Sequence, residues 1–159
     1  MNDRPTDPRP LLGEDALGDA GLRLDGAVRP RETIDGWATV ELDRAHEEVA
    51  GLAAARGTAT ASVVGDDHVL GARCRLLRFA DGGSILLLEP STEGRLAAAL
   101  VRHGEGFVAR YLLVDGGAPD RARRAGFTIS SGGHGPFGTQ RLVHAGPRSG
   151  PFLVLAGLD

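Results

Sequence analysis

Apolar and polar side chains alternate in several short segments of the first half of the chain, and a glycine, a proline or a polar turn bounds each segment. This alternation is typical of half-buried strands. It predicts four strands in this half, at residues 36–42, 58–64, 72–79 and 84–90. Residues 44–56 instead space their apolar side chains along one face of a helix, which Asp43 would cap and Gly57 would end.

The second half repeats this order of elements. A strand at residues 106–114 precedes a short helix at 118–126, and three further strands are predicted at 127–130, 138–144 and 151–157. Because a repeated order of elements constrains the fold strongly, the chain is predicted to be an α+β protein built from two tandem βαβββ modules.

The same pattern divides the chain into four parts. Residues 1–32 form a Pro/Gly-rich N-terminal tail, 33–90 the first module, 91–104 a linker with a helical turn or two, and 105–159 the second module. The tail holds four of the nine prolines and charges of both signs, a composition that is often poorly ordered.

Three glycines, Gly133, Gly135 and Gly138, match the spacing G-x-G-x-x-G of dinucleotide-binding loops. That motif binds a pyrophosphate only when a helix follows it, because the helix N-terminus receives the charge. Residues 139–143 (TQRLV) instead predict a strand, so we interpret the glycines as turn formers.

Composition narrows the class of protein further. The net charge is −3 with a pI of about 5.9, which gives no basic surface for nucleic acid. The single cysteine, Cys74, allows neither an internal disulfide nor a thiolate zinc site. No apolar run approaches the roughly 18 residues of a membrane span, and the N-terminus does not resemble a signal peptide, so a cytoplasmic protein without a membrane partner is expected.

Two consecutive modules of this order resemble the vicinal oxygen chelate superfamily, which includes the glyoxalase and bleomycin-resistance proteins. The best local matches are GGSILLLEPSTEG, GEGFVARYLLVD, GFTISSGGHGPFGTQRLV and GPFLVLAG, and the resemblance covers residues 33–158. It implies that the sheet curves around one cavity, that a small molecule occupies this cavity, and that a homodimer is an available assembly.

Enzymes of this superfamily usually hold a divalent metal with one side chain from the first and one from the last strand of each module. The resemblance places these positions at Gly36 or Trp37, near Leu86, at Val108 or Ala109, and near Val154. None of these residues can bind a metal, because His, Glu or Gln side chains supply the ligands. The sequence therefore predicts a member without a metal and without another cofactor.

Side chains of the first strands supply ligand-binding candidates. On 106–114 the face of Arg110 is expected to point into the cavity, although Tyr111 complicates that assignment. On 36–42 the mixed face carries Trp37 and Glu41. An indole wall, a carboxylate and a guanidinium would suit a flat organic molecule with polar edges, whereas the alternative is a core Trp beside a structural ion pair. Arg141 is a further candidate at the cavity rim.

Two histidines occupy matching turns of the two modules. His68 and His134 each precede the third strand of a module, flanked by glycines. A histidine there could act as a general base, with Glu89 and Glu41 as carboxylate partners, or could be an ordinary polar turn residue. If the protein is an enzyme, the predicted catalytic residues are His134, Glu89 and Glu41; the predicted ligand-binding residues are Trp37, Arg110, Tyr111, His68 and Arg141.

Three functions remain open from the sequence. The first is sequestration of an aromatic or polar-edged organic molecule, as in the resistance branch of the fold. The second is a metal-independent isomerase, lyase or cyclase of secondary metabolism that uses His, Glu and Arg side chains. The third is an interaction module that pairs with a second copy and binds no ligand.

Overall fold

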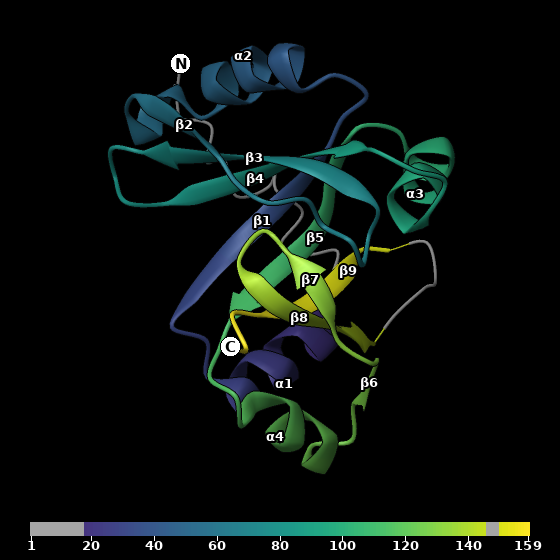
Figure 1. Ribbon diagram of the computed structural model, residues 1–159. Helices are drawn as coiled ribbons and strands as arrows, with labels where there is room; N and C mark the ends of the chain where they lie inside the picture. The colour runs from purple at the N-terminus through teal and green to yellow at the C-terminus, as the bar shows by residue number, and fades with distance from the viewer. Residues whose placement is uncertain (1–17, 146–149) are drawn as a thin grey trace.

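One continuous curved sheet organises the molecule. The computed structural model describes residues 18–145 and 150–159, and its strands follow the order β2-β3-β4-β1-β5-β9-β8-β6, with β7 paired to β8. Figure 1 shows the sheet curving around an inner, concave side while α2 lies over one half of its outer surface and α1 and α4 lie over the other.

The first module matches the predicted order. It comprises β1 (Glu32–Ala38), α2 (Leu42–Leu52), β2 (Ala59–Val63), β3 (Ala72–Phe79) and β4 (Ser84–Pro90), with a short 3-10 turn at Ala54–Arg56. The bounds of β3 and β4 are those predicted from the alternation.

The second module repeats the first with one addition. It comprises β5 (Gly106–Leu113), α4 (Ala118–Arg124), β6 (Thr128–Ile129), β8 (Gly138–His144) and β9 (Phe152–Ala156). The added strand is β7 (Gly133–Gly135), which forms a hairpin with β8. A strand rather than a helix follows the three glycines, so they do not form a dinucleotide-binding loop. The turn interpretation is confirmed for Gly138, whose φ is +101°, whereas Gly133 and Gly135 lie within β7.

Strand pairing gives the two modules equivalent places. The last strand of each module pairs in parallel with its first strand, β4 with β1 and β9 with β5. The two first strands then pair antiparallel at the centre, where Gly36 lies opposite Ala109. Because β4 and β9 hold the same position in the two halves, the predicted fold class, two βαβββ modules in one curved sheet, is confirmed.

Apolar side chains pack on both faces of the sheet. The concave side holds one cluster from both modules, and α3 (Arg95–His103), which lies in the predicted linker, adds Leu96 and Ala99 to it. On the outer surface, α2 covers β3 and β4 through Ala45 and Val49. The helices α1 and α4 cover β5 and β9 in a third cluster. The outer surface is thus covered by α2 over the first module and by α1 and α4 over the second, while α3 packs on the concave side.

The helix α1 (Gly18–Val28) lies in the part of the chain that was assigned to the tail. Its buried residues Leu24 and Val28 pack on the second module, and Arg121 of α4 donates to the carbonyl of Val28 at 2.7 Å. Contacts of a carbonyl at a helix C-terminus with an arginine are favourable because the helix dipole is negative there. Residues 1–17 lie outside the described residues.

The predicted bounds of the first strand and of the helix that follows it are wrong. The first strand occupies Glu32–Ala38 rather than 36–42, because Asp35 is held in the strand by an ion pair with Arg110. The helix α2 spans Leu42–Leu52 rather than 44–56. Glu41 is its N-cap residue, so Asp43 lies inside its first turn, and Gly57 ends the following 3-10 turn rather than α2 itself. In the first turn Asp43 still compensates the positive end of the helix dipole.

Candidate functional site

The centre of the concave side is apolar and tightly packed. Gly36, Leu86, Ala109 and Val154, the positions that the resemblance assigns to metal ligands, are buried there. A Cβ atom placed on Gly36 would lie 3.0 Å from Cδ1 of Leu88 and 3.2 Å from Cβ of Ala109. Carbon atoms therefore fill the place where the neighbouring strands bring these positions together.

A polar group lies beside this apolar centre. The carboxylate of Asp67, in the loop between β2 and β3, accepts a hydrogen bond of 2.5 Å from the hydroxyl of Tyr111 and one of 2.8 Å from Nε2 of Gln140. It also accepts hydrogen bonds from the backbone N–H groups of Val69 and Leu70. We call Asp67, Tyr111 and Gln140 the inner polar cluster. All three are fully buried, and they join a loop of the first module to two strands of the second.

Burial sets the protonation of the groups around Asp67. Burial and the negative charge of Asp67 raise the pKa of Tyr111 well above its ordinary value of 10.0, so the phenol keeps its proton and donates it. Burial and the same charge raise the pKa of the Cys74 thiol to about 12. Both groups are therefore neutral near pH 7, and Cys74 is not a thiolate nucleophile there.

One hydrogen-bond acceptor of the inner polar cluster is unpaired among the described residues. Oε1 of Gln140 is buried and has no hydrogen-bond partner among residues 18–145 and 150–159. It is pressed against Gly135 of β7, where a Cβ atom would overlap it, so only glycine fits above this side chain. A buried acceptor without a partner is costly, and it marks a place where a donor from a ligand would be stabilising.

The two histidine turns meet at the rim of the concave side. The backbone N–H of His68 donates to the carbonyl of His134 at 2.9 Å. Gly133 lies so close to Val69 that a Cβ there would be 2.7 Å from its side chain. The loop of module one and the β7–β8 hairpin of module two therefore close over the inner polar cluster, with both imidazoles exposed.

Arg110 and Trp37 lie on the other side of the sheet. Nε of Arg110 is 2.9 Å from the carboxylate of Asp35, and its side chain is only 13% exposed. Trp37 packs against the cluster under α2. Since Tyr111 faces the concave side, its neighbour Arg110 faces outward. The predicted placement of Arg110 and Trp37 in the cavity is therefore corrected.

The carboxylates proposed as catalytic groups also lie away from the inner polar cluster. Glu89 accepts the N–H of Leu42 at 3.0 Å and pairs with Arg73 at 2.6 Å, so it stabilises the start of α2. Glu41 is exposed beside Arg44. Arg141, on β8, donates to the carbonyl of Ser130 at 3.3 Å. Of the predicted site residues, Tyr111 belongs to the inner polar cluster, and the backbones of His68 and His134 meet at its rim. Glu89, Glu41 and Arg141 lie apart from it.

Sequence reasoning missed Asp67 and Gln140. Gln140 carried a usable signal, because it shares the inward face of β8 with Leu142 and is a polar residue on an otherwise apolar face. Asp67 carried none, since one of two adjacent aspartates in a turn is ordinarily exposed. In residues 18–145 and 150–159 no group of three or more His, Cys, Asp or Glu side chains is placed to hold a metal ion.

Several solved structures share this architecture. The methylmalonyl-CoA epimerase of Mycobacterium tuberculosis superposes with a TM-score of 0.67 at 20% identity, over 84% of this chain and 90% of the epimerase. A Streptomyces coelicolor methylmalonyl-CoA epimerase in complex with 2-nitronate-propionyl-CoA gives 0.62 at 20% identity, over 79% and 95% of the two chains. A substituted form of the Streptomyces coelicolor 4-hydroxymandelate synthase gives 0.51 at 15% identity, over 79% and 46%.

These neighbours have the vicinal oxygen chelate fold, so the fold implied by the resemblance is confirmed. At these identities the likeness extends to the fold alone. No protein-family model and no curated protein sequence matches the chain. No helix among the described residues is long and apolar enough to cross a membrane.

Proposed function

We propose that this chain is a cytoplasmic binding protein that sequesters a small organic molecule on its concave side without a metal ion. The observation that carries the proposal is the chemistry of the four ligand positions. Gly36, Leu86, Ala109 and Val154 offer no donor atom, and their neighbours fill the space with carbon. A metal needs three or four converging donors, so the fold must act here through its other side chains.

The inner polar cluster is the proposed recognition site. A ligand enters beneath the rim formed by the His68 loop and the β7–β8 hairpin, and its apolar part packs on the concave cluster. A hydroxyl or N–H group on the ligand donates to Oε1 of Gln140, the acceptor that lacks a partner. Because the cluster is fully buried, the rim must open for this contact to form.

Elemental analysis and ligand screening test the proposal together. Purified protein is expected to contain far less than one equivalent of zinc, nickel, manganese or iron. Thermal denaturation with a panel of aromatic and hydroxylated organic molecules is expected to identify compounds that raise the melting temperature. The Gln140→Met variant should lose that increase while the matched variant Arg141→Met keeps it. One equivalent of metal bound on the concave side, or equal ligand response in both variants, would overturn the proposal.

A metal-independent enzyme is the second candidate, and the pairing of Asp67 with Tyr111 favours it. A buried carboxylate and a phenol whose oxygens lie 2.5 Å apart are groups that can move a proton at the carbon of a bound compound. Uptake of solvent deuterium into a bound compound with an acidic C–H, followed by mass spectrometry, tests this function. Exchange that persists unchanged in Tyr111→Phe would exclude the pair as the acid–base group.

A further inference from the structure

The hairpin of β7 and β8 is attached to the main sheet at one end only. The strand β8 pairs with β9 from Arg141 to Val143, whereas residues 138–140 pair only with β7 among the described strands. We call residues 134–139, which lie beyond the last pair with β9, the hairpin tip. Figure 1 shows the hairpin over the concave side of the sheet, where Phe137 packs. Because the pairing with β9 ends before the tip, the tip can move without breaking the main sheet.

The loop on the opposite side of the rim is fixed to its own module. The backbone groups of Asp67 exchange two hydrogen bonds of 2.9 Å with Ala72 at the start of β3. The carbonyl of Leu70 accepts a hydrogen bond from the N–H of Leu96 in α3 at 3.0 Å. The N–H of Leu70 donates to the carboxylate of Asp67 at 2.8 Å. Since the loop is held by β3, α3 and its own carboxylate, the tip is the side of the rim that is able to open.

Hydrogen bonds hold the tip closed on both of its sides. On one side, the carbonyl of His134 accepts the N–H of His68 at 2.9 Å. On the other, the Asp159 carboxylate accepts hydrogen bonds from the hydroxyl and the backbone N–H of Thr139, and the N–H of Leu158 donates to the carbonyl of Thr139 at 3.1 Å. The bonds from Thr139 lower the pKa of Asp159 below its ordinary value of 3.8, so this carboxylate is charged near pH 7. His134 and Thr139 face each other in the hairpin, which joins the two sides mechanically.

The underside of the tip covers two groups of the inner polar cluster. The ring of Phe137 packs edge-on against Tyr111, with 5.8 Å between the ring centroids. Gly135 is pressed against Oε1 of Gln140, the acceptor without a partner among the described residues. Lifting the tip would let water or a ligand donate to this oxygen. Closure thus leaves an acceptor unsatisfied, which lowers the free energy needed to open the tip.

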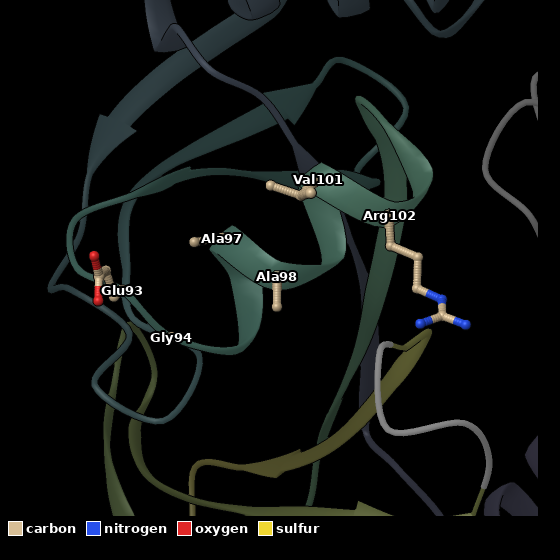
Figure 2. A pocket seen from close by; sticks show the side chains of 6 residues that line it. All are labelled: Glu93, Gly94, Ala97, Ala98, Val101 and Arg102. Atoms are coloured by element: carbon tan, nitrogen blue, oxygen red, sulfur yellow. The ribbon is translucent and has the colours of Figure 1, made fainter.

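The helix α3 offers no second way to the cluster. A shallow depression of about 580 Å³ lies on its outer side, as Figure 2 shows, while its inner side packs Leu96 and Ala99 on the concave cluster. The lining of the depression shares no residue with the inner polar cluster or the hairpin tip; it consists of Glu93, Gly94, Ala97, Ala98, Val101 and Arg102.

We propose that the hairpin tip is a lid over the inner polar cluster, which Phe137 holds down from beneath and Asp159 holds from the side. The tip opens as one unit while the loop of Asp67 stays in place, and it thereby exposes Tyr111 and Gln140. The inference rests on the proposed function, since it names the element that admits a ligand to that recognition site. The experiment below needs no ligand, so the lid and the proposed function can fail separately.

Amide hydrogen exchange, followed by NMR at single residues, tests the lid. The N–H of His68 is bonded to the tip and that of Leu70 to its own loop, so His68 should exchange at least about tenfold faster. Asp159→Ala should accelerate His68 about fivefold further, although Asp159 is bonded to Thr139 on the far side of the tip, and should leave Leu70 unchanged. The matched variant Glu47→Ala makes the same change of charge at an exposed position of α2 and should alter neither rate.

A second variant tests the contact beneath the tip. Phe137→Ala should accelerate exchange at His68 about tenfold, because the ring loses its apolar contact with Tyr111, whereas Val101→Ala in the depression on α3 should not. Rates of His68 and Leu70 that rise together would mean that the loop or the whole protein opens, and Asp159→Ala that accelerates only Thr139 would mean that the tip does not move as a unit. Either result would overturn the lid. The expected pattern supports it even if no compound raises the melting temperature, an outcome that would refute the proposed function alone.

Discussion

Two sets of polar contacts join the two modules, and they differ in burial and in the charges of the groups involved. The inner polar cluster holds one carboxylate, Asp67, with neutral donors in a fully buried place. The outer ion pairs, Asp35–Arg110 and Arg44–Glu105, use opposite charges on the other side of the sheet. The side chains of Arg44 and Glu105 are 46% and 32% exposed, so water competes for them.

This difference in burial indicates which of the two sets of contacts holds the two modules in their relative positions. Donors in the inner polar cluster have no access to water, so each is left unsatisfied if Asp67 is removed. Arg44 and Glu105 can be hydrated instead, and exposed pairs of this kind contribute little to stability. The Asp35–Arg110 pair, 14% and 13% exposed, lies between these two cases. The inner contact should therefore decide whether the loop of module one stays closed on module two.

Removing the shared acceptor should have the largest effect. Asp67→Ala leaves four donors without an acceptor, on Val69, Leu70, Tyr111 and Gln140, the last three of them buried, and should lower the free energy of unfolding by about 3–5 kcal/mol. Urea denaturation measures this change. The matched variant Asp66→Ala, at the exposed neighbouring position, should change stability by less than about 0.5 kcal/mol. Equal effects at the two positions would contradict the central role given to the inner polar cluster.

Removing one donor sharpens the comparison. Tyr111→Phe keeps the ring, which packs edge-on against Phe137 at 5.8 Å, and deletes only the hydroxyl. The free energy of unfolding should fall by about 1–3 kcal/mol, because one oxygen of the buried carboxylate loses its donor. In a double-mutant cycle with Asp67→Ala, the two losses should be far from additive. Additive losses would show that the hydroxyl and the carboxylate are not coupled.

Breaking the more buried outer pair should cost less. Arg110→Ala removes the partner of Asp35 and should lower the free energy of unfolding by about 1–2 kcal/mol, because a carboxylate that is only 14% exposed loses its charged hydrogen-bond donor and keeps little contact with water. It should leave ligand-induced changes in melting temperature intact, because Arg110 is on the outer side of the sheet. If a folded Arg110→Ala protein no longer responded to the ligand, Arg110 would have to belong to the binding site.

The smallest effect is expected at Glu105, and it should depend on pH. Hydrogen bonds from Arg44, the backbone N–H of Val40 and the Thr39 hydroxyl hold the pKa of Glu105 at about 2, below its ordinary value of 4.5. A lowered pKa contributes stability that is present above pH 4.5 and is lost as the pH falls toward 2.

Glu105→Gln should therefore destabilise the protein by about 0.5 kcal/mol near neutral pH, a small value because the carboxylate is partly exposed. Urea denaturation of both proteins at several pH values should show the two stabilities converging in acid. A difference that stays constant down to pH 2 would mean that the charge of Glu105 does not contribute.

The sequence predicted the strands well where alternation and turn signals agree. The bounds of β3 and β4 follow directly from the pattern around the turn at residues 80–83. The start of β1 did not follow, because an aspartate in a strand is unfavourable until its ion pair with Arg110 is known. The helix α1 was missed because its stability comes from packing on the second module rather than from its own residues.

The site was predicted only in part, for a related reason. Alternation correctly grouped Arg110 with Leu112 and Val114, but the choice of face was inverted. The choice rested on the expectation that a face under helices is wholly apolar, and Asp35 neutralises the one exception. An extra residue in β5, where the pairing with Gly36 and Trp37 shifts register, also breaks strict alternation along the strand.

The attachment of α1 to the second module has a consequence for biosynthesis. The apolar side chains Leu24 and Val28 leave the ribosome before β1, yet their partners in α4 and β9 are among the later residues of the chain. At about 5–20 residues per second, α1 waits on the order of ten seconds for the strand that buries it. During that interval the first module has its own helix α2 to fold against, whereas α1 remains an unpartnered segment that a chaperone could hold.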